Sequence, residues 1–161
     1  AIDGLTRAAA SLERAVEHPL DVAARREMMA AAMNGALAFQ KGLGGVHAMS
    51  HALGSFGGER LHHGTLNGVL LPHVIVFNAP AAGHRYEALA RAMGLPAGAD
   101  LAEAFARLAE RIGDPARLSE MGVEAGMLED AAPLAEKDHT NGTNPRRAAA
   151  EDYLALMREA L

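Results

Sequence analysis

From residue 42 the chain reads Gly42-Leu43-Gly44-Gly45-Val46-His47-Ala48-Met49-Ser50-His51-Ala52-Leu53-Gly54. Apart from two histidines and one serine the stretch is apolar, and glycines bound it on both sides. Because a solvated polar face does not have this composition, the histidines are candidates for chemistry. His62 and His63 follow shortly afterwards, so four of the eight histidines of the chain lie between residues 42 and 63.

His47 and His51 are four residues apart, and on a helix both imidazoles would project from the same face, about one turn apart. Imidazole pairs suit iron, zinc, copper or nickel. The chain has no cysteine, which excludes thiolate zinc sites and iron–sulfur clusters. His63 lies twelve residues beyond His51, past Gly57-Gly58, where the chain can turn and add a third imidazole. A histidine pair at this spacing also occurs as ordinary helix packing, so spacing alone leaves both interpretations open.

The residues after this stretch extend the pattern. They are His63-Gly64, Asn67, Leu70-Leu71-Pro72-His73-Val74 and Phe77-Asn78, and much later Thr143-Asn144-Pro145-Arg146. In this order the motifs resemble the signature and closing motif of the iron-containing (group III) alcohol dehydrogenase family. The resemblance implies an all-α fold, a helical bundle resembling the C-terminal domain of dehydroquinate synthase-like and iron-containing alcohol dehydrogenase enzymes.

The resemblance also implies roles for single histidines. By position, His47 and His63 match the two signature histidines that bind a divalent metal in the family, Fe²⁺ or Zn²⁺. His51 matches the histidine beside the nicotinamide and the substrate, which implies a catalytic, cofactor-contacting residue that relays a proton and does not bind the metal. His139, just ahead of the closing motif, becomes a candidate for the substrate pocket, and an exposed loop histidine is an equally good interpretation.

The resemblance covers the helical half of a family member. A member also has an N-terminal nucleotide-binding half with a Gly-rich phosphate loop, which this chain lacks. Its other two metal ligands come from an Asp-x-x-x-His motif. Asp3 opens a similar segment, but Arg7 stands in place of the histidine, and a guanidinium cannot bind a metal. We therefore expect residues 1–161 to form one helical domain that starts after that motif, with no metal role for Asp3, weak metal binding and no NAD(P) binding.

Composition excludes several function classes. The 161 residues include 15 basic and 20 acidic side chains, a net charge of −5, without the basic stripe that nucleic acid requires. No run approaches the roughly 18 apolar residues of a membrane span, and the N-terminus does not read as a signal peptide. We therefore expect a cytoplasmic protein without nucleic-acid or membrane partners.

Helical periodicity continues along the chain. We expect about seven to nine helices, including residues 1–16, 21–40, 46–53, 65–78, 86–93, 101–112 and 148–161. Asp21 and Asp100 are expected to cap the helices that follow them. Residues 74–77 favour a strand by propensity, but Pro72 argues against a central strand, and the resemblance favours a helix. In the second helix we expect a buried side formed by a methionine-rich stripe, Met28, Met29, Met33, Leu37 and Phe39.

Three functions are compatible with this sequence. The leading hypothesis is the metal-binding half of an NAD(P)-dependent alcohol dehydrogenase or aldehyde reductase, an oxidoreductase that needs the missing nucleotide-binding domain as its partner and is inactive as the isolated chain. The alternative is a non-catalytic helical interaction module, for example a homodimer. The third is a stand-alone metal hydrolase that uses the three histidines with Glu59, the weakest hypothesis because nothing else resembles a general base beside a metal.

Overall fold

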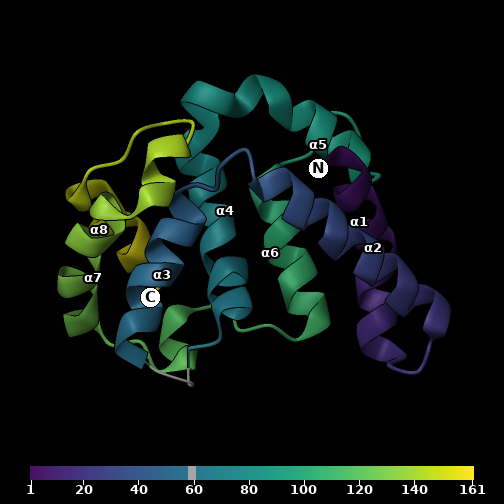
Figure 1. Ribbon diagram of the computed structural model, residues 1–161, viewed down its shortest axis with the longest axis horizontal. Coiled ribbons are helices and arrows are strands. Elements are labelled where there is room, and N and C mark those ends of the chain that lie inside the picture. Colours follow the sequence, from purple (N-terminus) through teal and green to yellow (C-terminus); the bar gives the residue numbers. More distant parts are fainter. Residues whose placement is uncertain (58–60) are drawn as a thin grey trace.

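The computed structural model describes residues 1–57 and 61–161 and is all-helical over them (Figure 1). Its elements are α1 (Ile2–Glu17), α2 (Val22–Phe39), α3 (Gly45–Gly57), α4 (His63–Ala82), η2 (Gly83–Arg85), α5 (Tyr86–Ala92), α6 (Leu101–Ile112), η3 (Leu118–Met121), α7 (Ala125–Lys137), η4 (His139–Thr143) and α8 (Ala150–Glu159). This confirms the predicted all-α fold, and the number of helices lies in the predicted range.

The helix ends follow from the side chains at each boundary. Asp21 accepts a hydrogen bond from the backbone N–H of Ala24, and Asp100 accepts one from that of Glu103, both at 3.0 Å. These bonds satisfy N–H groups that the first helical turn leaves unpaired. Both predicted N-caps are therefore confirmed. At the other end, α6 stops at Gly113, which has a positive φ that costs glycine little.

α4 lies at the centre of the fold, between α3 and α6 (Figure 1). Residues 74–77 are helical, as the family resemblance predicted against their strand propensity, because burial in a helical core outweighs local preference. The predicted end at Asn78 is wrong. α4 continues to Ala82 with Pro72 and Pro80 inside it, so neither proline ends the helix.

The apolar character of α4 also bears on membrane association. By length and composition alone, the helical stretch His63–Ala92 would suffice to cross a membrane. A core helix of a soluble protein meets the same criterion, and Leu66 and Leu70 of α4 are completely buried against other helices. Packing in the core therefore accounts for part of the apolar surface of α4, and 39% of the apolar stretch is buried.

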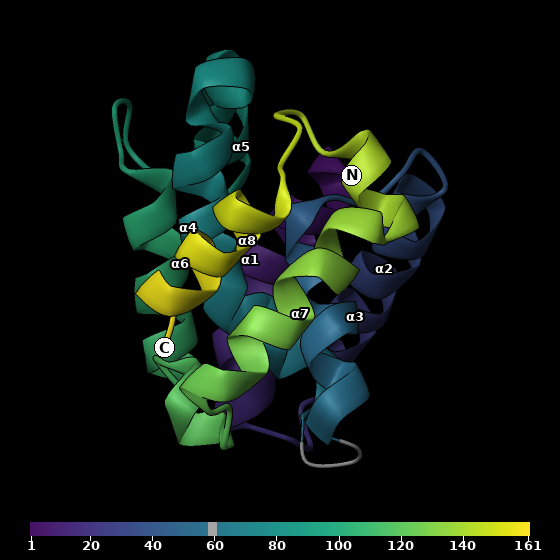
Figure 2. The same ribbon diagram turned by 90° about the vertical axis from the view of Figure 1, so that its left-hand side faces the viewer.

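The main core joins α4 to α3, α7 and α8, which lie together in Figure 2. Its largest fully buried side chains are Met49, Leu53, Leu66, Leu70, Leu118, Leu128, Tyr153 and Met157. α1, α2 and α6 lie on the other side of α4 (Figure 1). The two histidine-bearing helices, α3 and α4, are thus held by packing on several sides.

α2 contradicts the predicted buried stripe. Met29, Met33, Leu37 and Phe39 are exposed, by 74%, 68%, 67% and 48%, respectively. α2 instead packs on α1 through small residues, and its buried positions are Ala24 and Ala31. Alanines permit a close approach of the two helices, so the large apolar side chains are left on the opposite face. We call Met29, Met33 and Leu37, which lie on the side of α2 opposite Ala24 and Ala31, the α2 apolar face.

Candidate functional site

Three imidazoles converge where α3 meets α4. The ring centroids of His47 and His63 are 5.2 Å apart, those of His51 and His63 5.3 Å, and those of His47 and His51 5.8 Å. His47 and His51 occupy successive turns of α3, and His63 is the first residue of α4. Packing of α3 against α4 therefore brings His63 back to the pair. His62 is used differently, because its Nδ1 accepts a hydrogen bond from the N–H of Thr65 and caps α4.

Asn67 shows where the rings of His47 and His63 point. Its Nδ2 lies 3.1 Å from Nε2 of His63 and 3.5 Å from Nε2 of His47. The two Nε2 atoms thus face one position. The Oδ1 atom of Asn67 is buried and lacks a hydrogen-bond partner among the described residues. Two imidazole nitrogens directed at a common point are a donor set that fits a divalent metal ion.

The protonation of both rings agrees with this use. Burial, followed by repulsion from His63 and His51, lowers the pKa of His47. Burial, followed by repulsion from His51 and His62, lowers the pKa of His63. Both rings are therefore neutral at neutral pH, which is the form that binds metals.

Ser50 selects the tautomer of His63. Its Oγ is buried, lies 3.2 Å from the carbonyl oxygen of His47 and 3.3 Å from Nδ1 of His63. A hydroxyl has a single proton, and when that proton is donated to the carbonyl the oxygen can only accept from Nδ1. His63 then carries its proton on Nδ1 and keeps a lone pair on Nε2, toward Asn67. A hydrogen bond of this kind is how outer groups orient a metal-binding histidine.

His51 has a carboxylate neighbour that sequence reasoning missed. Its Nδ1 lies 3.0 Å from Oδ2 of Asp138, which follows α7. His139 is beside the same cluster, since its ring stacks on that of His51 with centroids 6.1 Å apart, although 84% of its side chain is exposed. The sequence signal for Asp138 was its place in a polar segment next to a candidate histidine. That signal could not show the contact with α3.

Within the part of the chain that the structure describes, His47 and His63 do not belong to a larger cluster of metal-binding side chains. Among residues 1–57 and 61–161, no group of three or more His, Cys, Asp or Glu side chains has a geometry that could hold a metal ion. His47 and His63 form a pair only. The carboxylate of Asp3 accepts a hydrogen bond from the guanidinium of Arg7 at 2.8 Å. Glu59 lies outside the described residues. Two imidazoles without further protein ligands bind a metal weakly.

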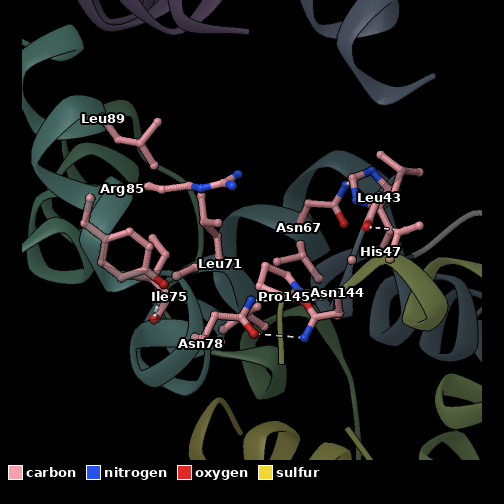
Figure 3. Close-up of a pocket in the computed structure, with 18 of the residues that line it drawn as sticks. Leu43, His47, Asn67, Leu71, Ile75, Asn78, Arg85, Leu89, Asn144 and Pro145 are labelled. Carbon is pink, nitrogen blue, oxygen red and sulfur yellow. Dashed lines mark hydrogen bonds between the residues drawn. The ribbon is translucent and has the colours of Figure 1, made fainter. Parts of the chain in front are cut away.

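The closing motif anchors the start of α3. Oδ1 of Asn144 accepts a hydrogen bond from the N–H of Gly45 at 2.9 Å, and the amides of Asn144 and Asn78 also bind each other (Figure 3). The guanidinium of Arg146 lies 4.0 Å from the ring centroid of Phe77 and donates to its carbonyl oxygen. The Asn-Pro-Arg segment thus joins α3, two residues before His47, to α4, about four turns beyond His63.

The contact between the closing motif and the start of α3 also requires the glycines that precede α3. Thr143 Oγ1 donates to the carbonyl oxygen of Leu43 at 2.7 Å. Gly42 has a φ of +112°, and a Cβ there would lie 2.5 Å from Cβ of Thr143. A Cβ at Gly44 would lie 2.8 Å from Oδ1 of Asn144. Only glycine allows the backbone to approach this closely.

A cavity of about 970 Å³ opens beside His47 and Asn67. Its walls are largely apolar, and they come from α4 and α5, including Leu71, Ile75 and Leu89, and from the start of α3 and the segment around Asn144 (Figure 3). Arg85 reaches into the cavity from the side of Leu89 (Figure 3). A concave, mostly apolar space with a few convergent polar groups is typical of binding sites.

Comparisons with known proteins agree with this geometry. A sequence model described as the Fe-containing alcohol dehydrogenase family, C-terminal, matches residues 1–161. The chain is 45% identical to 4-hydroxybutyrate dehydrogenase of Cupriavidus necator over 168 aligned residues, which cover 100% of this chain and 44% of that protein. It is 33% identical to 1,3-propanediol dehydrogenase of Klebsiella pneumoniae, covering 99% of this chain and 43% of the relative.

Solved structures give the same result. The crystal structure of a 1,3-propanediol oxidoreductase superposes with a TM-score of 0.94 at 31% identity, over 99% of this chain and 44% of that one. A structure of an alcohol dehydrogenase from Oenococcus oeni superposes with a TM-score of 0.91 at 32% identity, with the same coverage. The chain therefore spans less than half the length of the relatives it matches.

Proposed function

Because the chain belongs to the Fe-containing alcohol dehydrogenase family, we propose that it is the metal-binding helical half of an NAD(P)-dependent alcohol dehydrogenase or aldehyde reductase. The observation that carries the proposal is the direction of Nε2 of His47 and His63 toward one position, with His51 beside them. The partner is a nucleotide-binding domain, and the compartment is the cytoplasm.

In this proposal His47 and His63 hold Fe²⁺ or Zn²⁺ through Nε2, together with ligands from outside residues 1–161. A bound metal would supply Lewis acidity that acidifies an alcohol, and a bound nicotinamide would supply the hydride acceptor. The chain's own residues prepare this chemistry. Ser50 keeps the lone pair of His63 on Nε2, and Leu71 and Ile75 give the cavity beside His47 an apolar wall.

His51 takes up the hydroxyl proton when the alcohol is oxidised and returns it when the aldehyde is reduced. Histidine suits this step because its ordinary pKa is near neutral pH. Its ring is stacked 5.3 Å from that of His63, next to the proposed metal and outside the ligand pair. His139 stacks on the far side of His51 and borders the route of the proton or substrate to solvent. Since the named relatives are dehydrogenases of 4-hydroxybutyrate and 1,3-propanediol, we propose a small alcohol or its aldehyde as substrate.

The test combines metal content with turnover in a protein that joins this chain to its nucleotide-binding domain. His47→Ala and His63→Ala should be isolated without metal, because too few donors remain. His51→Ala should keep its metal and lose roughly 10²–10⁴-fold in turnover. His18→Ala, in the exposed turn after α1, is the control and should change neither. A His51→Ala variant without metal beside a His63→Ala variant with metal would overturn the assignment.

The α2 apolar face favours a second candidate function, a non-catalytic helical module that dimerises. Apolar faces of this kind mark interaction surfaces. The two functions are separated by turnover of the protein joined to its nucleotide-binding domain, which only the first predicts, and by gel filtration of residues 1–161, which should give a dimer under the second. We expect the isolated chain to bind no NAD(P), because it has no Gly-rich loop to receive the pyrophosphate. Cofactor binding at physiological concentration by the isolated chain would contradict this expectation.

A further inference from the structure

We propose that Asp138 is a positioning residue that holds His51 in the tautomer with its proton on Nδ1, so that Nε2 is the atom that accepts the substrate proton. The inference rests on the proposed function for the role of His51. The tautomer itself follows from the contacts of the described residues and can be measured without any activity.

Thr140 fixes the orientation of the Asp138 carboxylate independently of His51. Its Oδ1 accepts two hydrogen bonds from Thr140, from the backbone N–H at 2.8 Å and from the hydroxyl at 2.6 Å. Thr140 is itself buried. Oδ2 is left for Nδ1 of His51 at 3.0 Å, across 87 residues of sequence. The two carboxylate oxygens of Asp138 thus have different partners. The orientation in which Oδ1 accepts from Thr140 also places Oδ2 beside Nδ1 of His51.

An ionised carboxylate can only accept hydrogen bonds. Burial alone would raise the pKa of Asp138, but the hydrogen bonds from Thr140 and His51 outweigh it and keep the pKa below its ordinary value. Asp138 is therefore ionised at neutral pH, and a neutral His51 must donate through Nδ1. Its lone pair is then on Nε2. A partly buried carboxylate in this position also stabilises the imidazolium that forms when the proton arrives.

The other neighbours of His51 do not compete for Nδ1. Nε2 of His47 and of His63 both face Asn67, and Nδ1 of His63 faces Ser50. His139 lies 3.6 Å from Oδ1 of Asp138, the oxygen already used by Thr140, and is mostly exposed. Among the described residues, Asp138 is the group that decides the tautomer of His51.

The experiment is a long-range ¹H–¹⁵N correlation spectrum of the histidine side chains of residues 1–161, recorded with chelator at a pH where the imidazoles are neutral. In the wild-type chain Nδ1 of His51 should have the shift of a protonated nitrogen and Nε2 that of an unprotonated one. Asp138→Asn keeps an oxygen for Thr140 and presents an N–H group to His51, so the tautomer should reverse. Asp130→Asn, at an exposed position of α7, is the matched control and should change nothing. A wild-type His51 with its proton on Nε2 overturns the proposal, whether or not the variant folds.

A second measurement uses the protein with its nucleotide-binding domain. Asp138→Asn should lower kcat by about 10–100-fold, with metal content and KM unchanged, which is the usual effect of removing an outer partner of a site histidine. A reversed tautomer with unchanged kcat overturns the role of Asp138. If His51 carries its proton on Nδ1 but the joined protein has no dehydrogenase activity, the contact with Asp138 stands and the proposed function is wrong. Failure of the Asp138 proposal can therefore be distinguished from failure of the proposed function.

Discussion

The side-chain amides of Asn78 and Asn144 donate hydrogen bonds to each other, at 3.0 and 2.9 Å, across 66 residues of sequence. The same Oδ1 of Asn144 also accepts from the N–H of Gly45. One amide therefore connects α4, the first turn of α3 and the segment before α8. The position of His47, two residues into α3, depends on this connection.

Asn144→Ala should destabilise the chain. It removes the acceptor of Gly45 and leaves the largely buried amide of Asn78 without its partner, and an unsatisfied buried amide costs about 1–3 kcal/mol. Urea denaturation of residues 1–161 measures the loss. Asn34→Ala is the control, because Asn34 donates to the exposed Asp3 and its removal should cost less than about 0.5 kcal/mol. Equal losses in the two variants would show that the Asn78–Asn144 pair contributes nothing special.

A pair of glycine substitutions separates backbone strain from close contact. Gly42 and Gly98 both have positive φ, +112° and +77°, but a Cβ at Gly42 would lie 2.5 Å from Thr143 whereas one at Gly98 meets nothing within 4 Å. Gly98→Ala should therefore cost about 1 kcal/mol from strain alone. Gly42→Ala should cost at least about 2 kcal/mol more, because Thr143 must move as well. Thermal or urea denaturation gives both values, and the same loss at both positions would contradict the contact.

His73 gives the chain an acid-sensitive contribution to stability. Burial lowers the pKa of His73, and the nearby Glu159 acts in the opposite direction. The unfolded chain, with the ordinary value of 6.5, then binds the proton more readily than the folded one. The contribution is therefore present above pH 6.5 and is lost as the pH falls below it. Urea midpoints between pH 8 and pH 5 should fall less steeply for His73→Gln than for the wild type.

Glu159→Gln is the complementary variant. It removes the carboxylate that opposes the effect of burial, so the pKa of His73 should fall further and the acid loss of stability should become slightly steeper. The change is small, since Glu159 is mostly exposed at 3.8 Å from His73 and exposed pairs contribute little. A shallower pH dependence in Glu159→Gln would contradict the sign of this argument.

Substitutions in the α2 apolar face should reduce self-association of the isolated chain and leave its free energy of unfolding unchanged. Met29→Gln with Met33→Gln replaces side chains that are 74% and 68% exposed, so each should change the free energy of unfolding by less than about 0.5 kcal/mol. Dye binding and self-association, measured by fluorescence and sedimentation, should decrease. Met49→Gln, in the completely buried core, should instead destabilise the chain strongly. Unchanged association in the double variant would show that this face is not the contact surface.

Most of the fold could be predicted from local sequence. Asp21 and Asp100 are good caps in any context, and the apolar spacing of α6 indicates a helix without knowledge of its partners. The burial of α2 could not be predicted in this way. Its apolar content shows that one side avoids water, but not whether another element covers that side. The end of α4 was missed because Pro80 is tolerated inside a helix whose other bonds and packing are kept.

The site was predictable only in part. The spacing of His47 and His51 follows from helix geometry, whereas the approach of His63 depends on how α3 packs against α4, which no local pattern contains. Asp138 and Asn144 were harder still, because their partners on α3 are 87 and 99 residues away. A contact over such a distance leaves no trace in spacing, and only the motif around residue 144 drew attention to that segment.

The long range of these anchors has a consequence for the order of events in biosynthesis. The hydrogen bond that Asn144 accepts from Gly45 and the one that Thr143 donates to Leu43 close loops of 99 and 100 residues. Contacts of such separation form late in folding. Ribosomes add roughly 5–20 residues per second, so His47 leaves the ribosome about 5–20 s before Asn144. During that interval the bonds that orient α3, and with it His47, have not yet formed. Under the proposed function, a metal ion captured by the nascent chain would meet histidines whose orientation is not yet fixed, so selective metal loading would have to wait until Asn144 has been synthesised.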